Sequence, residues 1–279
     1  MALNATNVGL GLRREMLEEV QSFGCVPVDF WEVAPENWMP LGGRYQKQLS
    51  ALTQQYEFKT HGLSLSIGSP DALDIGFVKA VKRFLDEYNI STYSEHLSYC
   101  SAAGHLYDLM PIPFCQDAVR HVSDRVKQVQ DILQRPLALE NVSYYAAPDA
   151  QMAEIDFILS VLEQADCQLL LDVNNIYVNG VNHGYDAVTF LKAMPTDRIA
   201  YLHIAGHYNE ADDLIVDTHG ADVIQPVWDL LELTYQTHGV LPTLLERDFN
   251  IPPLPVLLKE VERIRALQMN YLPRQEQRA

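Results

Sequence analysis

Short β-rich runs alternate with amphipathic helical stretches along nearly all of this 279-residue chain. The β-rich runs lie at 7–11, 26–33, 57–60, 90–94, 136–139, 168–171, 198–202 and 241–245. Stretches with apolar residues at helical spacing lie at 13–23, 43–56, 73–88, 115–133, 152–164, 186–193, 221–238 and 254–267. Strands and helices that alternate in this way predict a parallel sheet with right-handed crossovers. We therefore expect an α/β fold, a single (β/α)8 TIM barrel.

The length of the chain and its apolar content fit one domain. A barrel of this kind takes roughly 250 residues, and 48% of the residues here are hydrophobic, which is enough for a large core. We expect the barrel to occupy residues 1–272 as a single domain, followed by a polar C-terminal tail at 273–279.

The charge balance is strongly acidic. Lys and Arg number 20 against 37 Asp and Glu, so the formal net charge is −17. A field of this sign repels phosphate backbones and anionic membrane surfaces, so we expect neither a nucleic-acid nor a membrane partner.

Features that would mark an exported or membrane-bound chain are not found in the sequence. The N-terminus, MALNATNVGLGLRREM, has no basic segment followed by an apolar one, and no run approaches about 18 apolar residues. The four cysteines are scattered and form no CxxC pair. We therefore expect a cytoplasmic protein.

Residue types that bind metal ions stand at or near the ends of most predicted strands. In chain order they are His61, His96, Glu140, Asp172, Asn175, His203, Asp217, His219 and Glu246. A single such residue carries little weight, because a carboxylate or imidazole near a loop is usually solvated. A series with nearly one per strand predicts a multinuclear metal centre, since parallel barrel strands deliver their carboxyl ends to one mouth.

Individual segments differ in how specific they are. The apolar run LLL delivers Asp172, and burying that carboxylate without a cation or strong donors would be costly. In IAYLHIAGH, Gly206 argues against a helical histidine pair, so we take His203 as the ligand and His207 as an outer or substrate-facing residue. For Glu140, an exposed carboxylate beside a helix-capping asparagine is about as good an interpretation as a bridging ligand.

The order of these residues resembles that of the xylose-isomerase-like barrels, including the endonuclease IV type. Their trinuclear site takes ligands in the order His, His, Glu, Asp, His, His, Asp, His, Glu. This chain differs at one place, where Asn175 stands for a histidine. An amide oxygen is a weaker and harder ligand than imidazole, so the third metal position is the one that this difference affects.

A closer resemblance is to the multinuclear non-heme iron-dependent oxidases, a family that includes the iron-binding subunit of methanobactin biosynthesis. The stretches that carry it are EVAPENW, HGLSLSIG, SEHLSY, LENVSYY, LDVNNIYVN, HIAGH, DTHG and LLERD. The resemblance implies two or three iron ions, a mixed-valent Fe(II)/Fe(III) state, and dioxygen as co-substrate. It also implies a cysteine-containing, ribosomally made precursor peptide as substrate in natural product biosynthesis, with a partner protein that delivers it.

By the same resemblance, the ligands divide among three ions. His61, His96 and Glu140 would hold the first; Glu140, Asp172, His203 and Glu246 the second; and Asn175, Asp217 and His219 a third. Glu140 would bridge the first two ions, and Glu140, Asp172 and His203 would be the catalytic residues. The ligand types alone suit zinc or manganese as well as iron.

Two other classes of function stay open at this stage. A metal-dependent hydrolase or isomerase on the same barrel would share the ligands and need no dioxygen. An endonuclease would want a basic groove, which the net charge of −17 disfavours. A metal-stabilised scaffold that binds a partner peptide would have closed coordination at its ions.

Overall fold

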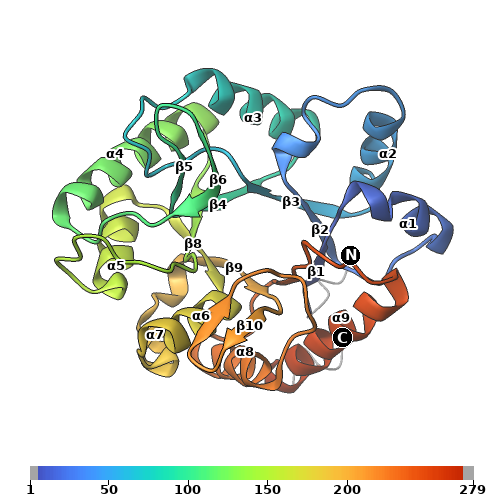
Figure 1. Cartoon of the computed structure of the whole chain (residues 1–279). Coiled ribbons are helices and arrows are strands. Elements are labelled where there is room, and N and C mark those ends of the chain that lie inside the picture. The colour runs from blue at the N-terminus through green and yellow to red at the C-terminus, as the bar shows by residue number, and fades with distance from the viewer. Residues whose placement is uncertain (1–5, 273–279) are drawn as a thin grey trace. The chain divides into compact units, whose positions relative to one another are not determined.

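Eight parallel strands form the centre of the fold in the computed structural model, which describes residues 6–272. They are β1 (Val8–Gly11), β2 (Phe30–Val33), β3 (Glu57–Gly62), β4 (Thr92–His96), β7 (Leu137–Glu140), β8 (Gln168–Asp172), β9 (Ile199–Ile204) and β12 (Thr243–Leu245). They close into a barrel in the order β1-β12-β9-β8-β7-β4-β3-β2 (Figure 1). The predicted α/β barrel class is confirmed, and each predicted strand overlaps one of these eight.

Helices follow the strands along the chain. They are α1 (Leu17–Phe23), α2 (Gly43–Thr53), α3 (Ile75–Glu87), α4 (Gln116–Leu133), α5 (Glu154–Ala165), α6 (Val173–His183), α7 (Ala187–Ala193), α8 (Gln225–His238) and α9 (Leu254–Tyr271). Short 3-10 turns lie at Arg14–Met16, Pro35–Asn37 and Thr196–Arg198. Each predicted helical stretch overlaps one of the α-helices, and α6 is an addition.

Helix α6 begins directly after β8, without a connecting loop. Asp172 ends β8 and is also the N-cap of α6, where its Oδ1 accepts a hydrogen bond from the backbone N–H of Asn175 at 2.6 Å. The asparagines that follow have modest helix propensity, so the sequence spacing did not indicate a helix here. The cap therefore places the Asp172 carboxylate at a junction that the rest of α6 holds in place.

Two antiparallel hairpins were not predicted from the sequence. One pairs β5 (Tyr99–Ser101) with β6 (His105–Met110), and the other pairs β10 (Tyr208–Ala211) with β11 (Leu214–Val216). No residue of β6 or β10 is fully buried, so their sequences lack the alternation that predicts a strand. Each hairpin follows a barrel strand that carries a candidate histidine ligand.

Strands of the barrel are buried on both faces, which explains their continuous apolar runs. Every residue of β1, β2, β7 and β12 is buried, as expected where helices cover a parallel sheet. Strand β2 begins at Phe30 rather than at residue 26, and before it the Val28 N–H donates to the Val26 carbonyl in a local turn at Pro27. Register pairs His61 with Ser94 and His96 with Glu140.

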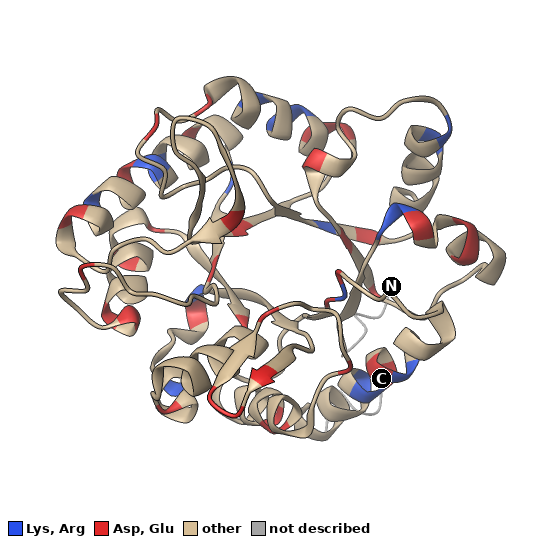
Figure 2. Ribbon diagram, in the orientation of Figure 1, with Lys and Arg blue, Asp and Glu red and all other residues tan. Residues whose placement is uncertain are grey.

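The described residues form two compact units. One comprises 6–32, 171–192 and 200–272, and the other comprises 33–170 and 193–199. A single catalytic domain over 1–272 stays a prediction, and the predicted tail at 273–279 lies outside the described residues. In Figure 2 the acidic residues, coloured red, are distributed over helices, strands and loops. None of the helices within 6–272 combines the length and the apolarity needed to cross a bilayer.

Position 206, between His203 and His207, has no room for a side chain. A Cβ at this position would lie 2.1 Å from the backbone oxygen of Ala221, which cannot move aside as a side chain would. We expect Gly206→Ala to lower the free energy of unfolding by about 1–3 kcal/mol, the usual range for overpacking. Denaturant unfolding of the purified variants measures this loss.

The matched control is Gly76→Ala in the first turn of α3. There a Cβ meets only the end of the Asp74 side chain, at 3.1 Å, and alanine favours the helix. Equal stability of the two variants would contradict the steric explanation for Gly206.

Candidate metal centre

The predicted ligands come from strand ends in most cases, but not in all. His61 lies in β3, His203 lies in β9, and His96, Glu140 and Asp172 are the last residues of β4, β7 and β8. Glu246 directly follows β12. Asn175 lies in α6, whereas Asp217 and His219 lie in the segment after β11. The candidate ligands therefore come from three kinds of element: strands, a helix and loops.

Three of the ligands form one cluster within the unit of residues 33–170, here called the β3–β4–β7 cluster. His61 Nε2 lies 3.2 Å from His96 Nε2 and 3.3 Å from Glu140 Oε2. His96 Nε2 lies 3.4 Å from the same Glu140 oxygen. Donor atoms around a tetrahedral ion at 2.0–2.1 Å stand about 3.4 Å apart, so this spacing fits a shared cation. Glu140 is only 2% exposed, and the alternative of a solvated carboxylate is wrong.

Ser94 fixes which nitrogen of His61 faces the cluster. The Ser94 hydroxyl donates to the backbone oxygen of Thr60 at 3.2 Å, and its oxygen lies 2.8 Å from His61 Nδ1. Because the hydroxyl hydrogen is used, the Ser94 oxygen accepts from Nδ1–H. His61 therefore presents the lone pair of Nε2 to His96 and Glu140, as a metal ligand does.

A second layer of carboxylates supports this cluster. Buried Glu95 accepts hydrogen bonds from the Tyr93 hydroxyl at 2.8 Å and from the Leu65 N–H at 2.9 Å, and its other oxygen lies 3.8 Å from His96 Nδ1. Burial and the neighbouring charge of Glu95 raise the pKa of Glu36 to about 7. A Cβ at Gly62 would lie 2.2 Å from Glu95 Oε1, so the glycine after His61 gives Glu95 its room.

The remaining ligands gather within the unit of residues 6–32, 171–192 and 200–272. Asp172, His203 and Glu246 each offer a ligand atom within 4.8 Å of the others, and we call them the β8–β9–β12 cluster. His203 Nδ1 lies 2.8 Å from Glu246 Oε2 and 4.0 Å from Asp172 Oδ2. Asp172 and His203 are fully buried and Glu246 is 5% exposed. Carboxylates this deep are costly without a cation or strong donors.

His219 extends this set toward two further carboxylates. Its Nδ1 lies 3.2 Å from Glu246 Oε2 and 3.3 Å from Asp248 Oδ2, and its Nε2 lies 2.7 Å from Asp217 Oδ1. Burial opposes a charge on the ring, but Asp217 and Glu246 outweigh it and raise the pKa of His219 well above its usual range. Asp248 joins His219 and Glu246 in a third group of candidate ligands. Sequence reasoning missed Asp248, although it directly follows Arg247 in the segment LLERD.

The asparagines at the start of α6 contact Asp172 and Asp217. The backbone N–H of Asn175 donates to the N-cap Asp172, and the Asn175 side chain is buried. The hydrogen bond from α6 to Asp217 comes from Asn174, whose Nδ2 donates at 3.0 Å. Asn174 Oδ1 also lies 2.7 Å from His207 Nδ1, and His207 stacks on Tyr177. A ligand role for Asn175 stays a prediction.

The donor set defines which ions would fit. Imidazole nitrogens and carboxylate oxygens make up the three groups of candidate ligands within residues 6–272, and none of these groups contains a cysteine. Such a set suits non-heme iron, zinc or manganese. Buried ligand atoms 2.8–3.4 Å apart are consistent with an ion between them.

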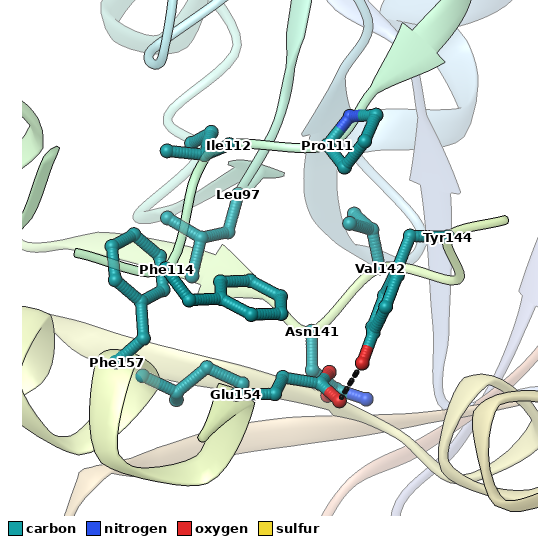
Figure 3. A pocket seen from close by; sticks show the side chains of 10 residues that line it. Leu97, Pro111, Ile112, Phe114, Asn141, Val142, Tyr144, Glu154 and Phe157 are labelled. Carbon is teal, nitrogen blue, oxygen red and sulfur yellow. Dashed lines mark hydrogen bonds between the residues drawn. The ribbon is translucent and has the colours of Figure 1, made fainter. Parts of the chain in front are cut away.

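A small pocket is lined in part by two residues that are sequence neighbours of the β3–β4–β7 cluster (Figure 3). Leu97 directly follows His96, and Asn141 directly follows Glu140. Apolar side chains from the segment before α4 and from α5 form half of its lining, and the Tyr144 hydroxyl donates to Glu154 Oε2 at 3.2 Å inside it. Its volume of about 20 Å³ holds roughly one water molecule.

Two solved structures with this fold share little sequence with the chain. A xylose isomerase domain containing protein from Salmonella typhimurium LT2 is 11% identical with a TM-score of 0.62, covering 96% of this chain and 99% of that one. Endonuclease IV from Thermus thermophilus is 12% identical with a TM-score of 0.59, covering 93% and 99%. These likenesses confirm the xylose-isomerase-like barrel and show the fold alone.

Sequence relatives are much closer. A "UPF0276 protein" of Shewanella amazonensis is 66% identical over 260 residues, which cover 93% of this chain and 94% of the relative. The sequence model of the family described as "RiPP precursor modification enzyme MbnB/TglH/ChrH" matches residues 7–269. The match spans every candidate ligand and both clusters. The chain therefore belongs to the MbnB/TglH/ChrH family of RiPP precursor modification enzymes.

Proposed function

We propose that this protein is a multinuclear iron-dependent oxidase that uses dioxygen to modify cysteine residues of a ribosomally made precursor peptide. Family membership supports an enzyme that acts on a precursor peptide. The observation that carries the finer assignment is the β3–β4–β7 cluster, whose three ligand atoms lie 3.2–3.4 Å apart in a buried site. Nitrogen and carboxylate donors without thiolate suit non-heme iron.

His61, His96 and Glu140 would hold one ion, and Asp172, His203 and Glu246 would hold a second, with Glu140 as the bridge. Asn175, Asp217 and His219 would hold a third. Support for the bridge comes from strand order, because β7 neighbours β8 in the barrel and parallel strands end at one mouth. Bound iron would supply the redox chemistry with dioxygen and would lower the pKa of a substrate thiol.

The chain's own side chains would bind and orient the ions. Ser94 holds the His61 ring by its Nδ1–H, so that the lone pair of Nε2 faces the cluster. Glu95 lies behind His96, and burial keeps bulk water away from Asp172 and His203. Holding a reacting carbon close to a preformed site is the main contribution that such a protein makes.

We also propose a partner protein that delivers the peptide, in the cytoplasm. The net charge of −17 supports an encounter with a basic segment of the peptide or of its carrier. Binding of either should then weaken as salt is raised, because screening shortens the reach of surface charge.

The test uses protein purified without oxygen and reconstituted with ferrous iron. Its substrate is the peptide encoded by a neighbouring short reading frame with cysteines near its C-terminus, and a peptide with these cysteines changed to serine is the matched control. We expect two or three irons per chain, a mixed-valent paramagnetic signal, and dioxygen consumption coupled to a mass change of the cysteine peptide alone.

Other outcomes would contradict the assignment. Turnover that needs no dioxygen, on a sugar or a phosphodiester, would indicate a metal-dependent hydrolase or isomerase. An active preparation that holds only zinc would overturn the choice of iron. Metal binding without change in any peptide would indicate a metal-stabilised scaffold.

A further inference from the structure

A buried carboxylate outside the candidate ligands lies against His203. Glu32 belongs to β2 and is 2% exposed. Its Oε2 accepts a hydrogen bond from the Tyr201 hydroxyl at 2.6 Å and lies 3.1 Å from His203 Nε2. One carboxylate oxygen thus meets two side chains of β9. The carboxylate belongs to none of the three groups of candidate metal ligands among the described residues.

The hydrogen-bonding roles in this trio are determined by chemistry. An ionised carboxylate only accepts hydrogen bonds, and the Tyr201 hydroxyl donates to Glu32. His203 must then donate through Nε2–H, which leaves the lone pair of a neutral ring on Nδ1. That nitrogen faces two more acceptors, Glu246 Oε2 at 2.8 Å and Asp172 Oδ2 at 4.0 Å. His219 Nδ1 lies 3.2 Å from the same Glu246 oxygen, and Arg13 lies 3.8 Å from the other. Between the His203 lone pair and Asp172, the arrangement suits a bound cation as a further partner.

We propose that Glu32 is a positioning residue that makes His203 bind its metal ion through Nδ1. The inference rests on the proposed function only in taking Asp172, His203 and Glu246 as the ligands of one ion. Glu32 does not touch that ion; it acts through the imidazole, by holding the ring and its tautomer. Tyr201 holds the Glu32 carboxylate in turn, so the order of contacts is Tyr201, Glu32, His203, ion.

The two clusters set their histidines in opposite ways. In the β3–β4–β7 cluster the Ser94 hydroxyl takes the Nδ1–H of His61, and Nε2 faces the ligands. In the β8–β9–β12 cluster Glu32 takes the Nε2–H of His203, and Nδ1 faces them. A charged acceptor makes the imidazole more basic than a neutral one does, which strengthens it as a ligand. Glu32 should therefore contribute to affinity as well as to orientation.

A purely structural ion pair between Glu32 and a protonated His203 is the competing explanation. Such a pair would need no metal ion, and losing one partner would destabilise the fold strongly. Metal affinity and tautomer distinguish the two explanations, because only the positioning role changes them in a folded variant.

The experiment measures binding of ferrous iron to the full chain without oxygen, by competition with a chromogenic chelator. Glu32→Gln keeps an acceptor oxygen, and Glu32→Leu removes it. We expect Glu32→Leu to weaken binding of one equivalent of iron by about 10–100-fold, the usual range for an outer-shell partner of a ligating histidine. Glu32→Gln should recover most of that loss. Tyr201→Phe should show an intermediate effect.

Tyr235→Phe is the matched control for the loss of a buried tyrosine hydroxyl. The Tyr235 hydroxyl is hydrogen-bonded to the Thr243 hydroxyl at 2.6 Å and not to a candidate ligand. The Tyr235→Phe substitution should leave iron affinity unchanged. Should Glu32→Leu fail to fold, ¹⁵N NMR of the wild-type protein loaded with zinc decides the point, since it reports whether His203 carries its proton on Nε2.

Two results would overturn the proposal: iron affinity of folded Glu32→Leu equal to that of wild type, or a His203 proton on Nδ1 in the zinc-loaded protein. Neither measurement uses a peptide or dioxygen. Wild type that binds iron as expected but leaves the peptide unchanged would refute the oxidase function and leave the role of Glu32 intact.

Discussion

Replacing Glu140 with alanine should lower turnover of the precursor peptide by about 10³-fold or more. Glu140 is buried, lies 3.3 and 3.4 Å from two imidazole nitrogens, and is the proposed bridge between two ions. A metal ion supplies several kcal/mol of charge stabilisation, and each 1.36 kcal/mol is about a tenfold change in rate. Single-turnover kinetics with iron-reconstituted protein measures the loss of turnover, and the iron content per chain measures the loss of bound metal.

The comparison variant is Asn175→Ala. Asn175 donates its backbone N–H to the N-cap Asp172, a bond that alanine keeps, and its side chain is assigned to the third position only by the proposal. Its effect on turnover should be milder if the third ion is dispensable. Equal losses in Glu140→Ala and Asn175→Ala would refute this ranking, and near-normal iron content in Glu140→Ala would refute the bridge.

Substitutions of Asp172 should separate a metal ligand from a helix cap at one residue. Asp172 is fully buried, its Oδ1 caps α6, and its Oδ2 faces His203. Asparagine is an N-cap about as good as aspartate but a poor ligand, whereas alanine is neither. Both Asp172→Asn and Asp172→Ala should lose the second ion and reduce turnover by about 10³-fold.

Stability should distinguish the two Asp172 variants from each other. We expect metal-free Asp172→Ala to unfold with about 1 kcal/mol less free energy than metal-free Asp172→Asn, the usual cost of a lost cap. Both variants remove the same charge, so relief of repulsion from Glu246 cancels in the comparison. Equal unfolding midpoints in denaturant would show that the cap contributes nothing, and full activity of Asp172→Asn would show that Asp172 is no ligand.

The eight-strand barrel could be predicted from the sequence because the patterns that indicate its strands and helices are local. Runs such as LLL before Asp172 and the helical spacing over residues 115–133 depend on the chain's own periodicity. Helix α6 was not predicted, since its first turn is capped by the last residue of a strand and is rich in asparagine. The hairpins β5–β6 and β10–β11 were missed because β6 and β10 have no buried residue and β5 and β11 are only three residues long.

The sequence by itself determined the residue types of the candidate site and the strands that carry most of them. His61, His96, Glu140, Asp172 and His203 stand at or near strand ends, and a parallel barrel brings such positions together. Only the tertiary structure decided their outer partners: Ser94 behind His61, Glu32 behind His203, and Asn174 beside Asp217. The contact between Asp248 and His219, at 3.3 Å, likewise comes only from the tertiary structure. Such contacts depend on side-chain direction and on register between distant segments, and neither leaves a periodic signal in the sequence.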